Sequence, residues 1–495
     1  MNTDRPARII YPFPKQLTWQ EGTLNIDSSV VLNVPAKSNC AEFFKESWGN
    51  FTCGKISLKV NTSSSQIENS FSLEVAGVPQ LPTLAEKSTY ALAVNASGVS
   101  AIATDDVSLR QAWLSMLQML TPKPGTREME GFQLPYVEIQ DYPLLKFRSA
   151  HLCVFPETTL SALEKSIHLL GMNKFTHVVI EFWGMLKLDT LSELSWPQAY
   201  SKDQVKPLLQ RIRDYGMQPI PMFNHWGHAT GSRVRNGRHA VLDQNPLLAP
   251  LFEPDGWTWC LTNPESLKIL AGVRRELIDL FGDIDYFHLG CDEAYSHATC
   301  DSCRKHNPAI LLAEFLNSVN ADLKKSGVRP LIWGDALLDN TAWEGYSAYS
   351  RSDQKTHEAI TLLSKDFIIV DWQYRLKDKK QNATLKYFMD QGFDVITAPW
   401  HDPENINALG EMAIAENAFG MMWTTWHTLP MRMNLLPFAG SVMWGGKDAG
   451  NGNPQYMSSY RTTTAAAFLR NVRQGPVDYA DAGWRSFEVI EAFEG

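Results

Sequence analysis

The strongest constraint on the fold is a regular alternation of short apolar runs with longer amphipathic segments after residue 141. Eight apolar runs follow one another, at 146–154, 176–182, 218–223, 284–289, 330–333, 367–372, 395–398 and 420–424. Helix-like segments lie between most of them, at 158–170, 202–215, 264–281, 308–325, 386–391 and 406–415. Strands that alternate with helices are typical of a parallel sheet. Eight such strands predict an α/β fold, a (β/α)8 TIM-type barrel over residues 141–445.

The first 140 residues predict a separate N-terminal α+β accessory domain. Strand-like runs separated by turn residues occur at 30–33, 55–60, 71–75, 90–94 and 99–104. Apolar residues at helical spacing follow at 109–120 and predict a covering helix. Residues 446–495 contain one more helix-like stretch, at 463–473, and we expect a C-terminal helical tail that packs on the barrel.

The composition argues against two classes of partner. A net charge of -9 argues against a nucleic-acid surface, and no apolar run reaches the length of a membrane helix. The N-terminal residues do not resemble a signal peptide, and the seven cysteines are an odd number that includes a CxxC. These features favour a cytoplasmic location. Sixteen tryptophans suit stacking on sugar rings as well as ordinary cores.

The fourth apolar run ends in Gly290, Cys291, Asp292 and Glu293, and catalytic groups of a (β/α)8 barrel follow its strands. Adjacent residues on a strand point to opposite faces, so the backbone must turn at Gly290 for both acids to reach one ligand. Two carboxylates suit cleavage of a glycosidic bond, because one donates a proton and the other stays charged beside the developing cation. An acidic pair that caps a helix is the alternative.

Polar and aromatic side chains also follow most of the other runs. They are Arg148, Glu181, His225, His228, Trp333, Asp335, Asp371, Trp372, Tyr374, Trp400 and Trp426. Their recurrence at successive strand ends is harder to explain as core filling than any one of them is. The pattern therefore predicts a ligand site to which several strands contribute.

Residues 288–293, His-Leu-Gly-Cys-Asp-Glu, resemble the His-x-Gly-Gly-Asp-Glu signature of glycoside hydrolase family 20, the β-N-acetylhexosaminidases. The resemblance extends along most of the chain. Residues 10–15 and 90–120 resemble parts of that family's accessory domain, 141–149 its entry to the barrel, and 221–228 and 261–265 the segments before the catalytic strand. The resemblance implies an exo-acting retaining enzyme that hydrolyses glycans with terminal β-linked GlcNAc or GalNAc.

The resemblance also implies a role for each residue that matches. In this family the 2-acetamido group of the substrate attacks C1 and forms an oxazolinium ion, so no cofactor is required for catalysis. Glu293 resembles the general acid, which then acts as the base, and Asp292 the group that orients the acetamido N–H. Arg148 resembles the residue that binds the sugar 3- and 4-hydroxyls. His228 resembles the histidine that supports the acid, and its alternative is a structural histidine.

Three tryptophans, Trp333, Trp372 and Trp426, resemble the walls around the acetamido methyl and the sugar ring, and barrel packing is their alternative. The match departs from the family at several positions. Cys291 replaces the second glycine, a change that the backbone tolerates if φ is negative at this position. The second strand lacks the family's Asp, for which Glu181 is the candidate partner of the supporting histidine. The usual Tyr of the seventh strand is also missing, with Tyr374 as the candidate substitute.

Cys300 and Cys303 form a CxxC a few residues after Glu293, with His297 and His306 beside it. This spacing suits a tetrahedral zinc ion that would brace the loop after the acid. A pair of free thiols is the alternative, and a disulfide fits a reducing compartment less well.

Two other function classes remain open from the sequence. One is a catalytically weakened barrel that binds N-acetylhexosamine glycans, which the altered hydroxyl contacts allow. The other is a zinc hydrolase that uses His225, His228 and the Cys cluster, although the HExxH framework is missing. The sequence predicts neither the oligomeric state nor the preference between GlcNAc and GalNAc.

Overall fold

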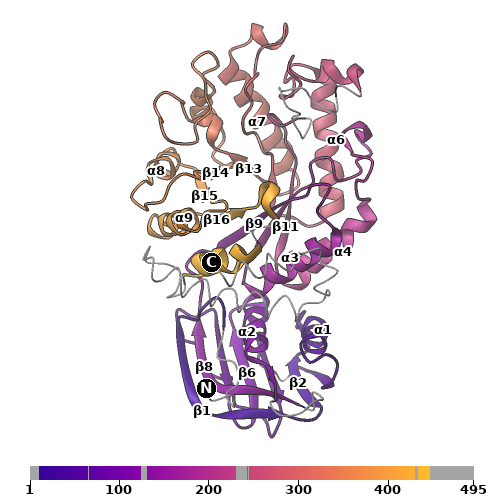
Figure 1. Cartoon of the computed structure of the whole chain (residues 1–495), viewed down its shortest axis with the longest axis vertical. Coiled ribbons are helices and arrows are strands. Elements are labelled where there is room, and N and C mark those ends of the chain that lie inside the picture. Colours follow the sequence, from indigo (N-terminus) through magenta and orange to yellow (C-terminus); the bar gives the residue numbers. More distant parts are fainter. Residues whose placement is uncertain are drawn as a thin grey trace.

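The structure is a computed structural model that describes residues 10–64, 66–123, 131–229, 242, 245–429 and 433–445. Figure 1 shows two units stacked along the long axis, an open sheet with helices below and a closed barrel above. The predicted tail at 446–495, with its helix-like stretch at 463–473, lies outside the described residues.

The N-terminal unit is a sheet with the strand order β1-β8-β5-β6-β4-β2-β3, in which β7 also pairs with β8. Its strands are β1 (Gln16–Ile26), β2 (Val30–Pro35), β3 (Leu58–Ser63), β4 (Ser70–Glu74), β5 (Tyr90–Val94), β6 (Gly98–Ala103), β7 (Thr121–Pro122) and β8 (Phe132–Asp141). All pairs are antiparallel except β2 with β3. Helices α1 (Ala41–Phe51) and α2 (Asp106–Met119) pack through Trp113, whose ring lies 4.5 Å from Phe44 and 5.3 Å from Phe71.

The second unit is the predicted (β/α)8 barrel, which confirms the fold class. Its parallel strands are β9 (Phe147–Cys153), β10 (His177–Glu181), β11 (Gln218–Met222), β12 (Tyr286–His288), β13 (Arg329–Trp333), β14 (Ile368–Asp371), β15 (Asp394–Thr397) and β16 (Gly420–Thr424). Pairing of β16 with β9 closes the barrel. Its helices are α3 (Leu160–Met172), α4 (Lys202–Asp214), α6 (Pro264–Phe281), α7 (Pro308–Lys324), α8 (Ala383–Asp390), α9 (Pro403–Ala415) and α11 (Leu436–Trp444).

Local sequence signals explain where these elements begin. Thr159 and Ser201 cap α3 and α4 by accepting hydrogen bonds from backbone N–H groups of the first turn. An Asn or Asp followed by Pro begins α6, α7 and α9. Apolar side chains such as Val179, Ile220 and Ile368 fill the barrel interior. The side chains that follow the strands therefore lie on a packed core.

Short 3-10 helices occupy Ser192–Leu194, Pro246–Leu251, Cys303–Lys305, Asp335–Leu337, Thr356–Thr361, Trp426–Thr428 and Met433–Leu435.

The two units meet through a buried polar cluster at the N-terminal ends of the barrel strands. Asp141, the last residue of β8, accepts hydrogen bonds from Lys174 Nζ at 2.9 Å and from the Tyr90 hydroxyl at 2.7 Å. Its other oxygen accepts one from Trp444 Nε1 of α11 at 2.8 Å. The side chains of Lys174 and Asp141 are fully buried. An ion pair of this kind fixes the sheet to the base of the barrel.

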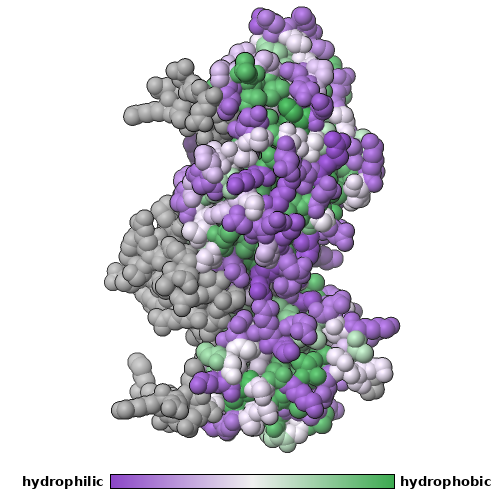
Figure 2. Space-filling model, turned by 90° about the vertical axis from the view of Figure 1, so that its right-hand side faces the viewer, coloured by the Kyte–Doolittle hydropathy of each residue, from purple (hydrophilic) through white to green (hydrophobic). Residues whose placement is uncertain are grey.

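The surface has mixed polarity. Figure 2 shows one face, on which hydrophilic side chains surround smaller hydrophobic areas. The exposed large apolar residues are far apart in the sequence: Ile67, Val78, Leu144, Leu247, Leu267, Ile310, Tyr349 and Leu362. Among the helices that the structure describes, none combines the length and the apolar character needed to cross a bilayer.

Candidate active site

Strand β12 ends at His288, and the backbone turns sharply in the residues that follow. Gly290 has a φ of 67°, and a Cβ there would lie 2.0 Å from Asn224 Oδ1. The predicted turn at this glycine is therefore present, and a larger residue would clash. Cys291 and Glu293 also have positive φ values, 75° and 50°. The negative φ that would make a cysteine in place of glycine easy to accommodate is therefore not found at Cys291. Non-glycine residues in this conformation are strained, and such strain gathers at functional sites.

Asp292 and Glu293 share one partner, the imidazole of His228. Its Nε2 lies 3.0 Å from Asp292 Oδ2 and 3.6 Å from Glu293 Oε2. This approach depends on Gly227, because a Cβ there would lie 1.9 Å from the Asp292 carbonyl oxygen. The Asp292 side chain is 6% exposed and that of Glu293 27%. The structure thus brings together the predicted acid pair and its predicted supporting histidine, and gives the two acids different environments.

Buried carboxylates raise each other's pKa at this end of the barrel. Burial raises the pKa of Asp292 well above its ordinary value, and the charges of Asp335, Glu293 and Glu181 add to the shift. Burial also raises the pKa of Asp335 to about 7, although hydrogen bonds from the Glu293 backbone and from Trp372 oppose the rise. Strongly perturbed carboxyl groups are typical of functional sites.

Asp335 and Trp257 hold the backbone of Glu293. Asp335 Oδ2 accepts a hydrogen bond from Glu293 N at 3.0 Å, and its Oδ1 accepts one from Trp372 Nε1 at 3.0 Å. Trp257 Nε1 donates to the Glu293 carbonyl oxygen at 2.8 Å, and its ring centroid lies 4.2 Å from that of His228. The sequence singled out Asp335 by its place after a strand but gave it no role. It gave no signal for Trp257, which lies in the loop between β11 and α6.

The four aromatic residues predicted to contact the sugar lie next to one another. The rings of Trp333 and Trp426 are 5.5 Å apart, and those of Trp372 and Tyr374 are 5.1 Å apart. The Tyr374 hydroxyl accepts a hydrogen bond from Trp426 Nε1 at 2.7 Å, which joins the two pairs. Trp333 is only 1% exposed, whereas the other three are half-buried. The indole N–H of Trp333 has no hydrogen-bond partner within the described part of the chain.

Glu181 belongs to a buried network inside the barrel. The sequence made Glu181 the candidate partner of His228. In the structure its carboxylate contacts His151 Nε2 at 2.9 Å and accepts a hydrogen bond from Asn224 Nδ2 at 2.6 Å. The Cys153 thiol lies 3.6 Å from the same carboxylate. A cavity at the ends of β10 and β11 is lined in part by Glu181, Asn224 and His228. The network therefore connects the interior of the barrel with the surroundings of the acid pair.

Arg148 lies at the wrong end of the barrel for the role predicted for it. It is the second residue of β9, at the N-terminal base, whereas Asp292 follows the C-terminal end of β12. The buried guanidinium donates to the carbonyl oxygens of Lys174 at 2.8 Å and Leu145 at 2.7 Å, and it lies 5.0 Å from the ring centre of Trp444. The prediction that Arg148 binds sugar hydroxyls is therefore wrong, and its role is structural.

The predicted metal ligands Cys300 and Cys303 belong to a larger cluster. It includes Cys260 and Glu253, and the four ligand atoms all lie within 4.8 Å of one another. All seven cysteines are free thiols. A second group with ligand atoms at such distances is the His151, Cys153 and Glu181 network. The histidines considered as ligands from the sequence lie outside both groups, which were found within the described residues: His225, His228, His297 and His306.

A closed (β/α)8 barrel with an Asp-Glu pair and an aromatic wall at the strand ends is typical of glycoside hydrolases. Two family models match this chain. The catalytic domain of glycosyl hydrolase family 20 matches residues 129–405, and domain 2 of the same family matches residues 7–142. The chain therefore belongs to glycosyl hydrolase family 20, as its sequence signature predicted.

Individual relatives are distant. Lacto-N-biosidase of Bifidobacterium bifidum is 21% identical over 361 residues, which cover 68% of this chain and 30% of the relative. Human Hexosaminidase D is 25% identical over 192 residues, which cover 36% of this chain and 37% of the relative. The chain therefore matches about a third of the length of these curated relatives.

Solved structures of the family share the fold. The exo β-N-acetylglucosaminidase of Vibrio harveyi, in complex with N-acetylglucosamine, superposes with a TM-score of 0.69 at 17% identity and covers 98% of this chain and 80% of that one. The β-N-acetylhexosaminidase of Bacteroides fragilis gives a TM-score of 0.68 at 19% identity, over 97% and 99% of the two chains. At these identities the likeness shows the fold alone.

Proposed function

We propose that this protein is an exo-acting, retaining β-N-acetylhexosaminidase that removes terminal β-linked GlcNAc, GalNAc or both from glycans through an oxazolinium intermediate. The observation that carries the proposal is the unequal pair Asp292 and Glu293 in a family 20 barrel. One carboxyl is buried and the other is partly exposed, and both contact His228. Two carboxyl groups in different environments divide acid and electrostatic roles between them.

Glu293 is suited to proton transfer with solvent and leaving group because its side chain keeps exposed surface. In the first step the acetamido oxygen attacks C1, the glycosidic bond breaks, and the leaving oxygen takes the proton of Glu293. In the second step Glu293 takes a proton from the water that attacks C1, and the acetamido group is restored. Tyr295 donates a hydrogen bond to Glu293 and thereby orients it. Each of the two steps inverts the configuration at C1, so the product retains the anomeric configuration of the substrate.

Asp292 is suited to hold the acetamido group. Its Oδ1 is buried and meets no donor from another residue within the described chain, so an acceptor is available for the substrate N–H. In this buried position a carboxylate stabilises the positive oxazolinium more strongly than it would in water. The half-buried Trp372, Tyr374 and Trp426 would enclose the acetamido methyl, which holds the nucleophilic oxygen near C1.

The proposal is tested with the aryl β-glycosides of GlcNAc and GalNAc, a natural disaccharide and a lacto-N-bioside. The parent should release monosaccharide from the disaccharide and from at least one of the two aryl glycosides, and the relative rates rank the two sugars. Glu293→Gln should lower the rate on the disaccharide by about 10²–10⁴-fold, and less on aryl glycosides, whose leaving group needs little protonation. The matched control is Glu265→Gln, at an exposed glutamate in the first turn of α6, which should retain parental activity.

Proton NMR of the first product gives the anomer, and β product supports retention. An α product would contradict the mechanism. A folded parent that binds these sugars without cleaving any of them would instead support the weakened, binding-only barrel. Release of the intact disaccharide from the lacto-N-bioside alone would replace the exo-monosaccharide proposal with the activity for which the Bifidobacterium relative is named.

A further inference from the structure

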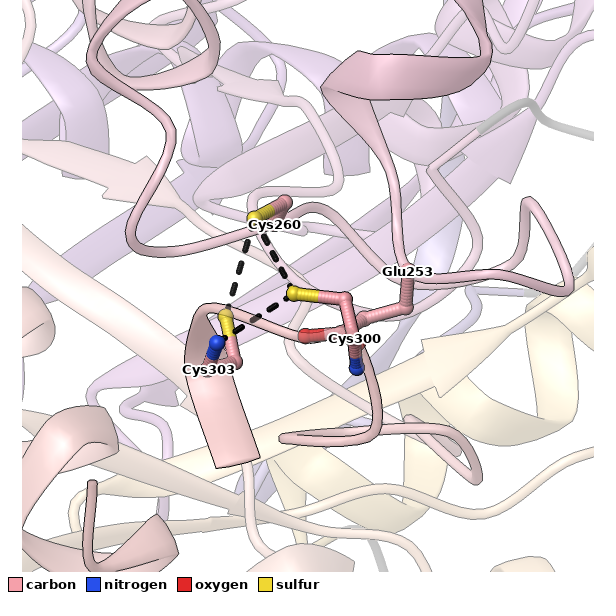
Figure 3. Close-up of side chains that lie close together, drawn as sticks. All are labelled: Glu253, Cys260, Cys300 and Cys303. Carbon is pink, nitrogen blue, oxygen red and sulfur yellow. Dashed lines mark hydrogen bonds between the residues drawn. The ribbon is translucent and has the colours of Figure 1, made fainter. Parts of the chain in front are cut away.

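Two loops beside the acid pair meet at a cluster of three thiols and one carboxylate (Figure 3). Cys260 Sγ lies 3.7 Å from Cys300 Sγ and 3.6 Å from Cys303 Sγ, and the Glu253 carboxylate completes the group. Glu253, Cys260 and Cys303 are buried, at 1%, 4% and 0% exposure. Cys260 and Glu253 come from the segment before α6, and the other two from the segment that follows Glu293.

The separations fit a tetrahedral zinc ion. A zinc–sulfur bond of about 2.3 Å places the sulfur atoms of a regular tetrahedron about 3.8 Å apart. A disulfide needs sulfur atoms about 2.05 Å apart, which these thiols do not approach. Three thiolates with one carboxylate form a set of four ligands for a borderline-soft ion.

Glu253 supplies a second, independent observation. Its Oε2 accepts hydrogen bonds from Cys300 N at 2.6 Å, from Thr299 N at 3.0 Å and from the Thr299 hydroxyl at 3.1 Å. Its Oε1 is buried and has no hydrogen-bond partner among the residues that the structure describes. A buried carboxylate oxygen without a donor is costly, and a cation removes that cost.

Neighbouring groups would also support bound thiolates. The Cys303 backbone N–H lies 3.3 Å from Cys300 Sγ, and the Thr262 hydroxyl lies 3.2 Å from Cys303 Sγ and 3.4 Å from Cys260 Sγ. Hydrogen bonds from groups around a metal site orient its ligands and favour their charged form. The cluster therefore has both the ligands and the surrounding donors of a metal site.

We propose that Glu253, Cys260, Cys300 and Cys303 bind one structural Zn²⁺ that ties the loop before α6 to the segment after the acid pair. With four protein ligands the ion would have no open position for a substrate or water, as in other structural zinc sites.

The proposed ion lies on a path to the acid pair through Trp257. This tryptophan lies between Glu253 and Cys260 in sequence, and it donates to the Glu293 carbonyl oxygen while its ring packs against His228. Fixing both ends of this loop fixes Trp257, and Trp257 fixes the backbone of the acid. Loss of the ion should therefore loosen the acid without removing any catalytic group.

The first test is the metal content of the folded protein, which does not depend on hydrolysis. Protein made with added zinc and dialysed should contain close to one zinc per chain by mass spectrometry. Cys260→Ser should contain far less. The matched control is Cys53→Ser, at an exposed cysteine in the accessory domain, which should bind zinc like the parent. Glu253→Gln keeps the shape of the side chain, so it tests the site even if Cys260→Ser does not fold, and it should bind zinc at least tenfold more weakly in competition with a chromophoric chelator.

Three further results decide the proposal. Cobalt(II) in place of zinc should give sulfur-to-metal charge-transfer absorption that weakens in Cys300→Ser. Chelation should lower the melting temperature by several degrees and reduce the hydrolytic rate without abolishing it, and added zinc should restore both. Zinc-free folded parent, iron in place of zinc, or equal zinc in the parent and in Cys260→Ser would overturn the site. Complete loss of hydrolysis at unchanged stability would overturn the structural role.

Discussion

The two ends of the barrel both bury charge, but they do so in opposite ways. At the base, Asp141 accepts five hydrogen bonds, from Lys15 N, Tyr142 N, Tyr90, Lys174 and Trp444. Cations outnumber carboxylates there, since Lys174 and Arg148 both lie close to Asp141. At the strand ends, carboxylates gather instead, and atoms such as Asp292 Oδ1 and Trp333 Nε1 lack partners within the described residues.

The difference separates two uses of buried polarity. A saturated cluster such as that of Asp141 offers nothing to a ligand, and it stabilises the contact between domains. An unsaturated cluster costs stability in the free protein, and a ligand with the complementary groups recovers that cost. Substitutions at the two ends should therefore have opposite signatures, a loss of stability at the base and a loss of activity at the strand ends.

The largest expected effect is that of Asp292→Asn. Its hydrolytic rate should fall by about 10²–10⁴-fold, because the neutral amide cannot stabilise a positive oxazolinium. Its melting temperature should stay the same or rise, because the substitution removes a buried carboxyl group whose ionisation is disfavoured by burial and by the neighbouring acids. Steady-state kinetics and a thermal melt check both expectations. A variant that melts well below the parent would place Asp292 with the stabilising residues of the base.

Asp141→Asn should show the reverse signature. Two buried cations, Lys174 and Arg148, lose their counterion, which should lower the free energy of unfolding by about 3–5 kcal/mol. The rate per folded molecule should stay close to that of the parent, because the base contacts no catalytic group. Asp27→Asn, which breaks the exposed pair with Lys123, is the control and should change stability by less than about 1 kcal/mol. Denaturant titration measures all three proteins, and equal losses in both variants would refute the comparison.

The smallest expected effect is a pH dependence at Asp335. Its pKa is about 7 in the folded protein and about 3.9 in an unfolded chain. As the pH rises from about 4 to 7, the unfolded state releases this proton first, so the free energy of unfolding of the parent should fall. Asp335→Asn has no carboxyl group at this position, so its stability lacks this pH dependence. Its stability relative to the parent should therefore rise between pH 5 and pH 8, on the order of 2–3 kcal/mol. A difference that stays constant or falls over that range would contradict the assignment.

Most of the barrel could be predicted from its sequence, because each strand is a compact apolar run and most of the strands are followed by a helix. All eight strands fall within two residues of their predicted limits, and α6 spans 264–281 as predicted. Three strands of the accessory domain, β1, β7 and β8, were not predicted, and β7 is only two residues long. Most side chains of β1 are exposed or half-buried, and β8 contains Pro135, so neither gives a clean apolar run. Helix α1 was also missed, although its Phe and Trp residues have helical spacing.

The site was predicted where ionisable residues directly follow an apolar run in the sequence, as Asp292 and Glu293 do. Arg148 was assigned to the wrong end of its strand. A polar residue within an apolar run shows that a strand passes through this part of the chain, but its polarity does not show whether its side chain lies at the base of the barrel or at the end with the active site. Cys260 and Glu253 were missed because they lie 40 and 47 residues before Cys300 in the sequence. Only the folded chain brings their loop beside the CxxC.

The buried cluster at the base also bears on how the molecule unfolds. Asp141 belongs to the sheet, whereas Lys174 and Trp444 belong to the barrel, so neither unit satisfies its own buried groups alone. In a barrel separated from the sheet, Lys174 and Arg148 would lose the negative charge of Asp141, and an unpaired charge at a buried position is unfavourable. The accessory domain and the barrel should thus unfold as one cooperative unit, and the catalytic barrel is not a module that could be moved to another chain by itself.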